Sequence, residues 1–196
     1  MQKILATLAI MILAACGSAA QTGPKTSNPP LAKEPAPKTD DAQKPPMERD
    51  GLTLKFTHLA FQITMTPSPW KGNYTEDPNN GAQIAFERDD LSSVLLIMPV
   101  AAKNLSAQGL ADDQHQKAMK DASLTVGAVT AENGGRYAFT IDRMADGVAH
   151  RTYLAVTPHP SLPDAYIVGV AEGTTSTSDA FLKEVRTVLD SISPIK

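Results

Sequence analysis

The chain has 196 residues, of which 18 are Lys or Arg and 21 are Asp or Glu, and it contains one Cys and 15 Pro. These totals exclude a strongly basic nucleic-acid-binding protein, a scaffold held by disulfides, and a multi-domain enzyme of ordinary size. The placement is uneven, because seven of the prolines lie within residues 17–50 and all ten aromatic residues follow residue 50. We therefore divide the chain into a targeting peptide, a tether and one domain.

Residues 1–15 are predicted to be a lipoprotein signal peptide. Lys3 gives a short positive region, and the nearly unbroken apolar run that follows it, residues 4–13, is too short to span a bilayer as a helix. The next residues, Leu13-Ala14-Ala15-Cys16, match the lipobox of bacterial lipoproteins. This resemblance implies cleavage before Cys16 and attachment of lipid, palmitate included, to its thiol. The alternative is an ordinary secreted protein in which Cys16 is incidental.

The lipid on Cys16 is expected to fix the protein to a membrane, since two or three acyl chains anchor stably where one binds only marginally. By resemblance to the sorting rule of Gram-negative lipoproteins, Gly17 in place of Asp after the Cys argues against retention in the inner membrane. We therefore expect a protein of the bacterial cell envelope, held in the outer membrane and facing the periplasm.

The tether, residues 16–50, is predicted to be disordered. After Cys16 it consists mainly of Pro, Ala, Lys, Asp, Gln, Ser and Thr, and its five basic residues balance five acidic ones. Such a segment cannot bury enough apolar surface to offset the entropy of ordering it. As a random coil it reaches about 30 Å. We interpret it as a spacer, while the alternative is a peptide ligand for another envelope protein.

The domain, residues 51–196, is long enough for one core and carries 12 basic and 16 acidic side chains, so nucleic acid is not an expected partner. Apolar periodicity predicts a set of strands connected by turns at 132–135 and 146–147. The predicted strands are 52–56, 59–65, 83–87, 94–100, 124–131, 136–143, 148–156 and 165–171. Residues 67–81, which include Trp70, are predicted to be a turn-rich loop.

Two helices complete the domain. One is predicted over residues 107–122 with Ser106 as its cap, and the other begins near Ser178. The second carries an apolar stripe at helical spacing, formed by Phe181, Val185, Val188, Leu189 and Ile192. Strands, a helix, four antiparallel strands and a closing helix indicate an α+β fold, an antiparallel β-sheet flanked by helices.

The domain resembles the Mog1/PsbP-like superfamily, including bacterial envelope proteins of the DcrB type. The residues that carry the resemblance are 61–67 (FQITMTP), Pro69-Trp70, Gly134-Gly135-Arg136, Arg151-Thr-Tyr153, Tyr166-Ile-Val168 and the final stripe from Phe181 to Ile192. The resemblance implies an α/β/α sandwich. It also implies a binding or assembly module, because the superfamily has no catalytic signature.

The usual signatures of catalysis and cofactor binding are absent from the sequence, so we expect no enzyme and no cofactor. Asp112, Asp113 and His115 give the best hint of a metal site, but a solvated helix face is the better interpretation. His150 is expected to pair with Asp142, and His159 is expected to be an exposed loop residue. The acidic pair that follows Arg88 is interpreted as a charged turn rather than a calcium site.

Trp70, the only Trp, is predicted either to contact a partner or to close the end of the core as a lid. The leading functional hypothesis is a non-enzymatic envelope lipoprotein that binds or helps assemble another envelope component. The alternative is a module for a small apolar ligand or lipid in the periplasm, with a pocket lined by Met65, Met98 and Met119.

Overall fold

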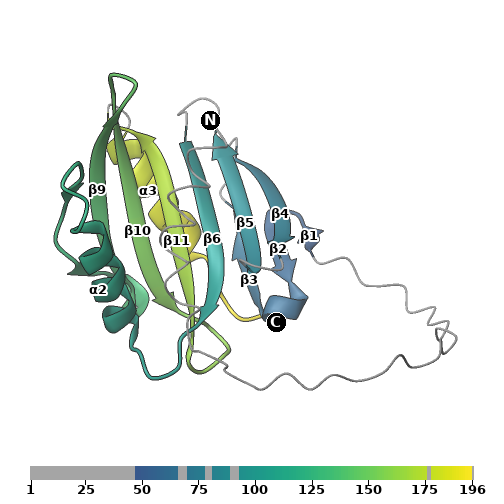
Figure 1. The fold of residues 1–196 in the computed structure, drawn as a ribbon. Coiled ribbons are helices and arrows are strands. Elements are labelled where there is room, and N and C mark those ends of the chain that lie inside the picture. Colours follow the sequence, from purple (N-terminus) through teal and green to yellow (C-terminus); the bar gives the residue numbers. More distant parts are fainter. Residues whose placement is uncertain (1–46, 66–69, 78–80, 89–92, 176–177, 196) are drawn as a thin grey trace, which may run out of the picture.

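The computed structural model describes residues 47–65, 70–77, 81–88, 93–175 and 178–195. It has a large antiparallel sheet with helix α2 on one face and helix α3, together with a small second sheet, on the other (Figure 1). This arrangement confirms the predicted α+β class. The predicted signal peptide, Cys16 and most of the predicted tether lie outside the described residues, as does the acidic pair that follows Arg88.

The large sheet has eight strands in the order β4-β5-β6-β11-β10-β9-β7, with β8 also paired to β9. All of its pairings are antiparallel. The strands are β4 (Lys71–Asp77), β5 (Gly81–Arg88), β6 (Ser93–Ala101), β7 (Thr125–Val126), β8 (Thr130–Ala131), β9 (Tyr137–Ala145), β10 (Val148–Pro158) and β11 (Ala165–Thr174). β9 and β10 form a hairpin around Asp146-Gly147, and both residues have positive φ as this tight turn requires.

The small sheet has the order β1-β2-β3, with β1 (Glu48–Asp50), β2 (Thr53–Phe56) and β3 (Phe61–Thr64). A short 3-10 helix, η1 (Thr57–Leu59), joins β2 to β3. Strand β1 lies within the segment predicted to be disordered tether, so ordered structure begins earlier than residue 51. Its three residues pair with β2, and Met47 before them packs against the core.

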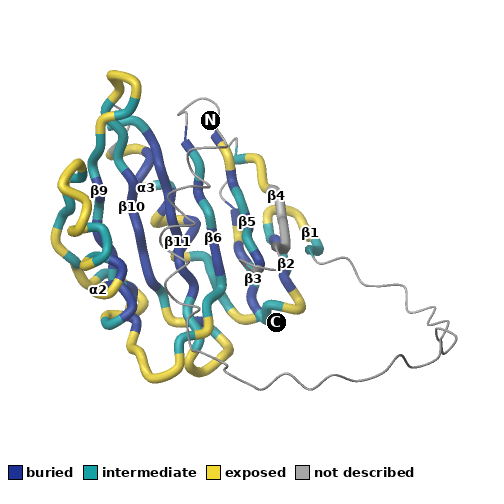
Figure 2. Tube along the Cα trace, viewed as in Figure 1, coloured by how far each residue is buried: buried dark blue, intermediate teal, exposed yellow. Residues whose placement is uncertain are grey.

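The two helices are α2 (Ala107–Ala118) and α3 (Ser178–Asp190). The Ser106 hydroxyl accepts a hydrogen bond from Gly109 N–H at 3.0 Å and caps α2 as predicted. α2 packs on β9 and β10, whereas α3 packs on β11 and β3. Each face of the large sheet therefore has its own core, and the interior strands are buried, β11 along most of its length and β10 along its middle (Figure 2).

Three further elements differ clearly from the sequence prediction. β4 forms where a loop was predicted. Its sequence, KGNYTED, has no apolar alternation that would indicate a strand, and backbone pairing to β5 holds it in place. The predicted strand 124–131 is interrupted at Gly127, which packs so close to β9 that a Cβ would lie 2.9 Å from the Thr140 hydroxyl. α2 ends at Ala118 rather than at residue 122, and Met119, the capping residue, is exposed.

Candidate functional site

Trp70 directly precedes β4 and lies beside the last residue of β5. Lys71 pairs with Glu87, so the antiparallel register places Trp70 next to Arg88. The Arg88 guanidinium carbon is 5.6 Å from the centre of the Trp70 ring, within the range of a cation–π contact. Both side chains also contact Glu184 of α3: the indole N–H donates at 3.3 Å, and Arg88 Nη1 forms an ion pair at 2.7 Å.

These contacts make Trp70 a half-buried side chain at the rim of the α3 face. The ring packs against the core cluster on that face, as is expected of a side chain that closes the end of the core. Part of the Trp70 side chain is still exposed, so its contact with a partner stays a prediction. Cys16, the other predicted functional residue, lies outside the described residues.

A second polar group centres on Glu132 at the turn before β9. One of its carboxylate oxygens accepts hydrogen bonds from Tyr153 Oη at 2.7 Å and Arg136 Nε at 3.0 Å. The other accepts two from Arg186 of α3, at 3.1 and 2.9 Å. Arg136 also pairs with Asp190, and the Arg186 guanidinium lies 5.3 Å from the centre of the Tyr153 ring. The network therefore joins α3 to β10 and to the turn.

The protonation states of this network do not suit proton transfer at neutral pH. Burial opposes ionisation of Glu132, but the hydrogen bonds from Tyr153 and Arg186 and the charge of Arg136 outweigh it and hold the pKa of Glu132 below its ordinary value. Burial, and then the neighbouring carboxylate, raise the pKa of Tyr153 far above its ordinary value. Glu132 is thus a fixed anion and Tyr153 a fixed donor, which is a structural arrangement.

The hairpin end of the sheet carries a third charged group, and here the predicted pairing of His150 with Asp142 is wrong. The register places Arg151 opposite Asp142, and the two form a two-point ion pair at 2.6 and 2.7 Å. Adjacent strand residues point to opposite faces, so His150 lies on the other face, 3.4 Å from the buried Glu172. Glu172 also accepts a hydrogen bond from Arg143 at 2.7 Å.

Two of the three helix residues weighed as metal ligands, His115 and Asp113, have other partners. His115 Nε2 donates to the Gly127 carbonyl at 3.1 Å, and its ring packs edge-on against Phe139. Asp113 pairs with Lys117 one turn further along α2. Among the residues that the structure describes, no group of three His, Cys, Asp or Glu side chains is arranged to hold a metal ion. In the same part of the chain, no helix is both long and apolar enough to cross a membrane.

The prediction that His159 is exposed is wrong, because its side chain is buried at 7% exposure. Its Nε2 donates to the Leu59 carbonyl at 3.0 Å, and its Nδ1 accepts hydrogen bonds from the N–H groups of Ser161 and Leu162 at 3.1 Å each. Burial lowers the pKa of His159, although the bond to Leu59 opposes this in part. The neutral ring thus ties the β10–β11 loop to η1.

The predicted apolar pocket does not form from the three methionines named for it. Met65 belongs to the core on the α3 face and Met98 to the core on the α2 face, so the large sheet separates them. Met119 is exposed at the end of α2. A ligand could not touch all three side chains.

The Glu132 network was missed by reasoning from the sequence. Gly134-Gly135-Arg136 and Arg151-Thr-Tyr153 were both singled out by the family resemblance, but nothing in the sequence joined them to each other or to α3. Arg136 and Asp190 are 54 residues apart, and only the packing of α3 on the sheet brings them together.

Comparison with known proteins identifies the fold. No family model and no curated protein sequence matches the chain. The structure is similar to that of the cyanobacterial PsbP protein of Synechocystis sp. PCC 6803, with a TM-score of 0.50 and 12% identity, covering 83% of this chain and 100% of that one. It is also similar to the Saccharomyces cerevisiae Ran-binding protein Mog1p, with a TM-score of 0.51 and 7% identity, covering 74% of this chain and 95% of that one.

A weaker similarity, with a TM-score of 0.41 and 7% identity, is to LpqN of Mycobacterium tuberculosis, a protein involved in cell envelope biogenesis. It covers 69% of this chain and 91% of that one. At these identities, what the Synechocystis and yeast structures show is the fold alone. The domain has the Mog1/PsbP-like fold, as the sequence predicted.

Proposed function

We propose that the protein is a membrane-anchored envelope lipoprotein whose domain binds, or helps assemble, another envelope protein without catalysing a reaction. The observation that carries the anchor is the sequence Leu13-Ala14-Ala15-Cys16 directly after a short apolar run, with Cys16 the only Cys in the chain. Lipid on Cys16 would hold the domain at the outer membrane, facing the periplasm.

The polar groups described above support a binding role over an enzymatic one. The pKa of Glu132 is held below its ordinary value and the pKa of Tyr153 above its own, so both are shifted away from the near-neutral values that general acid–base catalysis needs. Trp70, by contrast, keeps part of its ring exposed beside Arg88, and Trp and Arg are the residues most enriched where proteins bind one another. We assign the partner contact to Trp70 on that basis.

Two experiments test the two parts separately. Labelling cells with a palmitate analogue should mark the wild-type protein and leave Cys16→Ala unmarked, and equal labelling would refute the anchor. Cross-linking in intact cells should then recover a reproducible protein partner that is lost in Trp70→Ala. The matched control is Met144→Ala, at an exposed side chain on the β9–β10 hairpin. Equal recovery from both variants would refute the role of Trp70.

A further inference from the structure

One histidine holds the loop between β10 and β11, residues 159–164, on η1. His159 is the only buried side chain of this loop, since Pro160 is half-buried and residues 161–164 are exposed. The Leu59 carbonyl to which its ring donates belongs to η1. Both segments lie at the end of the large sheet opposite to the β9–β10 hairpin (Figure 1). The attachment of the loop to η1 therefore depends mainly on a single ring.

The hydrogen bonds of His159 fix the ring in one neutral tautomer. The N–H groups of Ser161 and Leu162 can only donate, so the Nδ1 atom that accepts both of them carries no proton. The proton of the neutral ring is then on Nε2, which donates to the Leu59 carbonyl. Residues 160–163 contain no other backbone donor, because the remaining two are prolines. A proton on Nδ1 would therefore break every backbone bond that this turn donates.

The ends of the loop and of η1 differ in how they respond once those bonds are lost. The base of the loop is held to the sheet without the ring, because Ala102 N–H donates to the Asp164 carbonyl at 3.0 Å and His159 N–H donates to the Ala165 carbonyl at 2.9 Å. Ala60, at the end of η1, has a φ of 56°, a left-handed conformation that is strained for Ala and persists only where neighbouring contacts hold it. Movement is thus confined to residues 160–163 and η1.

The closed position of His159 offers a proton no counter-charge among the residues that the structure describes. β3 and the segment that pairs with it, residues 191–195, carry no charged side chain. The charged or titratable side chains on the other adjoining segments are all exposed: His58 on η1, Lys103 on the loop from β6 to α2, and Asp164. Burial lowers the pKa of His159, and the bond to the η1 carbonyl opposes this only in part. The protonated ring therefore has to leave its site to reach water.

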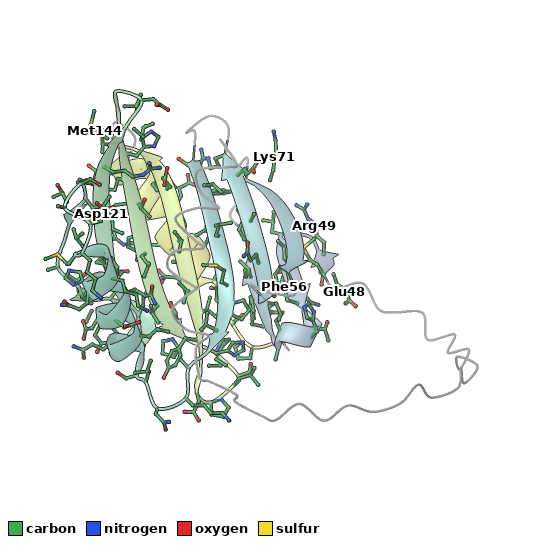
Figure 3. All side chains as sticks on the ribbon, viewed as in Figure 1. Glu48, Arg49, Phe56, Lys71, Asp121 and Met144 are labelled. Carbon is green, nitrogen blue, oxygen red and sulfur yellow. The ribbon has the colours of Figure 1, made fainter. Side chains whose placement is uncertain are left out.

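We propose that His159 is an acid-sensitive latch: its neutral ring holds residues 160–163 on η1, and a proton on Nδ1 releases them. Release also uncovers Phe61, which is fully buried and whose ring packs edge-on against His159 at 5.6 Å between ring centres. Phe61 packs in turn on Phe56, the residue before η1 (Figure 3), at 5.4 Å. The acid form thus presents an apolar edge of the core that the neutral form covers. The latch operates independently of the lipid anchor and of a partner.

Amide hydrogen exchange of the whole domain measures this release. In wild type, the protection of the Ser161 and Leu162 amides, corrected for intrinsic rates, should fall by about tenfold or more between pH 7.5 and pH 5.0. The limit is about thirtyfold, which is the factor for a ring that titrates at its ordinary pKa of 6.5 when released and binds no proton when closed. The amides of β11 and of the β9–β10 hairpin, with Met144 at its tip (Figure 3), should keep their protection.

His159→Asn removes the titrating group but keeps an acceptor. Its Oδ1 can accept the N–H groups that follow it, as Asx turns do, so protection at Ser161 and Leu162 should no longer depend on pH. His58→Asn, the same change at the exposed histidine of η1, should keep the wild-type dependence. Unchanged protection of wild type at pH 5.0, a loss shared by all amides, or a fall that persists in His159→Asn would overturn the proposal. The first two outcomes need wild type alone, so the test does not depend on the folding of either variant.

Discussion

Glu132→Gln should destabilise the fold through one buried cation, Arg136. The change keeps an oxygen that can accept the Tyr153 hydrogen bond but removes the charge that faces two guanidinium groups. The Arg136 side chain is only 3% exposed, and removing one partner of a buried ion pair costs about 3–5 kcal/mol. Arg136 keeps its ion pair with Asp190, and the pair with Arg186 contributes little because that side chain is 46% exposed. We therefore expect Glu132→Gln to lower the unfolding free energy by about 3 kcal/mol, the low end of this range.

Urea unfolding, followed by the fluorescence of Trp70, measures this loss. The matched control is Asp142→Asn, which removes the anion of a two-point Arg pair whose side chains are 35% and 31% exposed. Water screens that pair, so its loss should cost less than about 1 kcal/mol. Both changes replace a carboxylate by its amide, and they differ most in the burial of the cation left behind, Arg136 at 3% exposed against Arg151 at 31%.

The effect of Glu132→Gln also has a predicted dependence on pH. The pKa of Glu132 is lower in the folded protein than its ordinary 4.5, so its charge stabilises the fold above that pH, and the contribution is lost as the pH falls through the folded-state value. The difference in unfolding free energy between wild type and Glu132→Gln should therefore be largest near neutrality and become smaller in acid. A cost no larger than that of Asp142→Asn, or one that is the same at both extremes, would refute the reasoning.

Three further variants test other parts of the fold by the same unfolding assay. Wild type should lose stability as the pH falls below about 6.5, because burial lowers the pKa of His159 in the folded protein. A proton on Nδ1 would also break the hydrogen bonds from the Ser161 and Leu162 N–H groups. His159→Gln should therefore make the unfolding free energy depend less on pH in this range. Gly169→Ala places a Cβ 3.0 Å from Leu189 and should cost about 1–3 kcal/mol. Gly109→Ala, in the first turn of α2, places a Cβ at an ordinary contact distance of 3.4 Å from Ser106 Oγ and should instead stabilise by up to about 1 kcal/mol. A stabilising Gly169→Ala or a steep slope in His159→Gln would contradict these expectations.

Local features of the fold could be predicted from the sequence because each depends on a few neighbouring residues. The Ser106 cap, the turn at Asp146-Gly147 and the apolar stripe of α3 all belong to this kind. The side chain of Ser106 reaches an N–H three residues away, and the turn needs two residues that tolerate positive φ. Such local patterns can be recognised in the sequence without knowledge of the tertiary fold.

Features that are set by backbone pairing, by strand register or by contacts between distant segments could not be predicted. β4 is polar, and its hydrogen bonds go to β5, so it carries no periodic pattern of its own. His159 looked exposed because two prolines flank it, yet the carbonyl that it binds, that of Leu59, is 100 residues away. His150 was assigned to the wrong partner because a shift of one residue in a strand moves a side chain to the opposite face.

The polar residues of α3 show how the helix is fixed on the sheet. Glu184 and Arg186 are two positions apart, about 200° around a helix, so they point to opposite flanks, whereas Asp190 follows Arg186 by four positions and shares its flank. Glu184 accordingly meets Trp70 and Arg88 at the β4–β5 side, while Arg186 and Asp190 meet Glu132 and Arg136 beyond β10. The apolar stripe sets which face of α3 is buried, and these two flanks fix its position across the sheet. A partner that engages Trp70 would therefore contact a residue already bonded to the element that joins both sides of the domain.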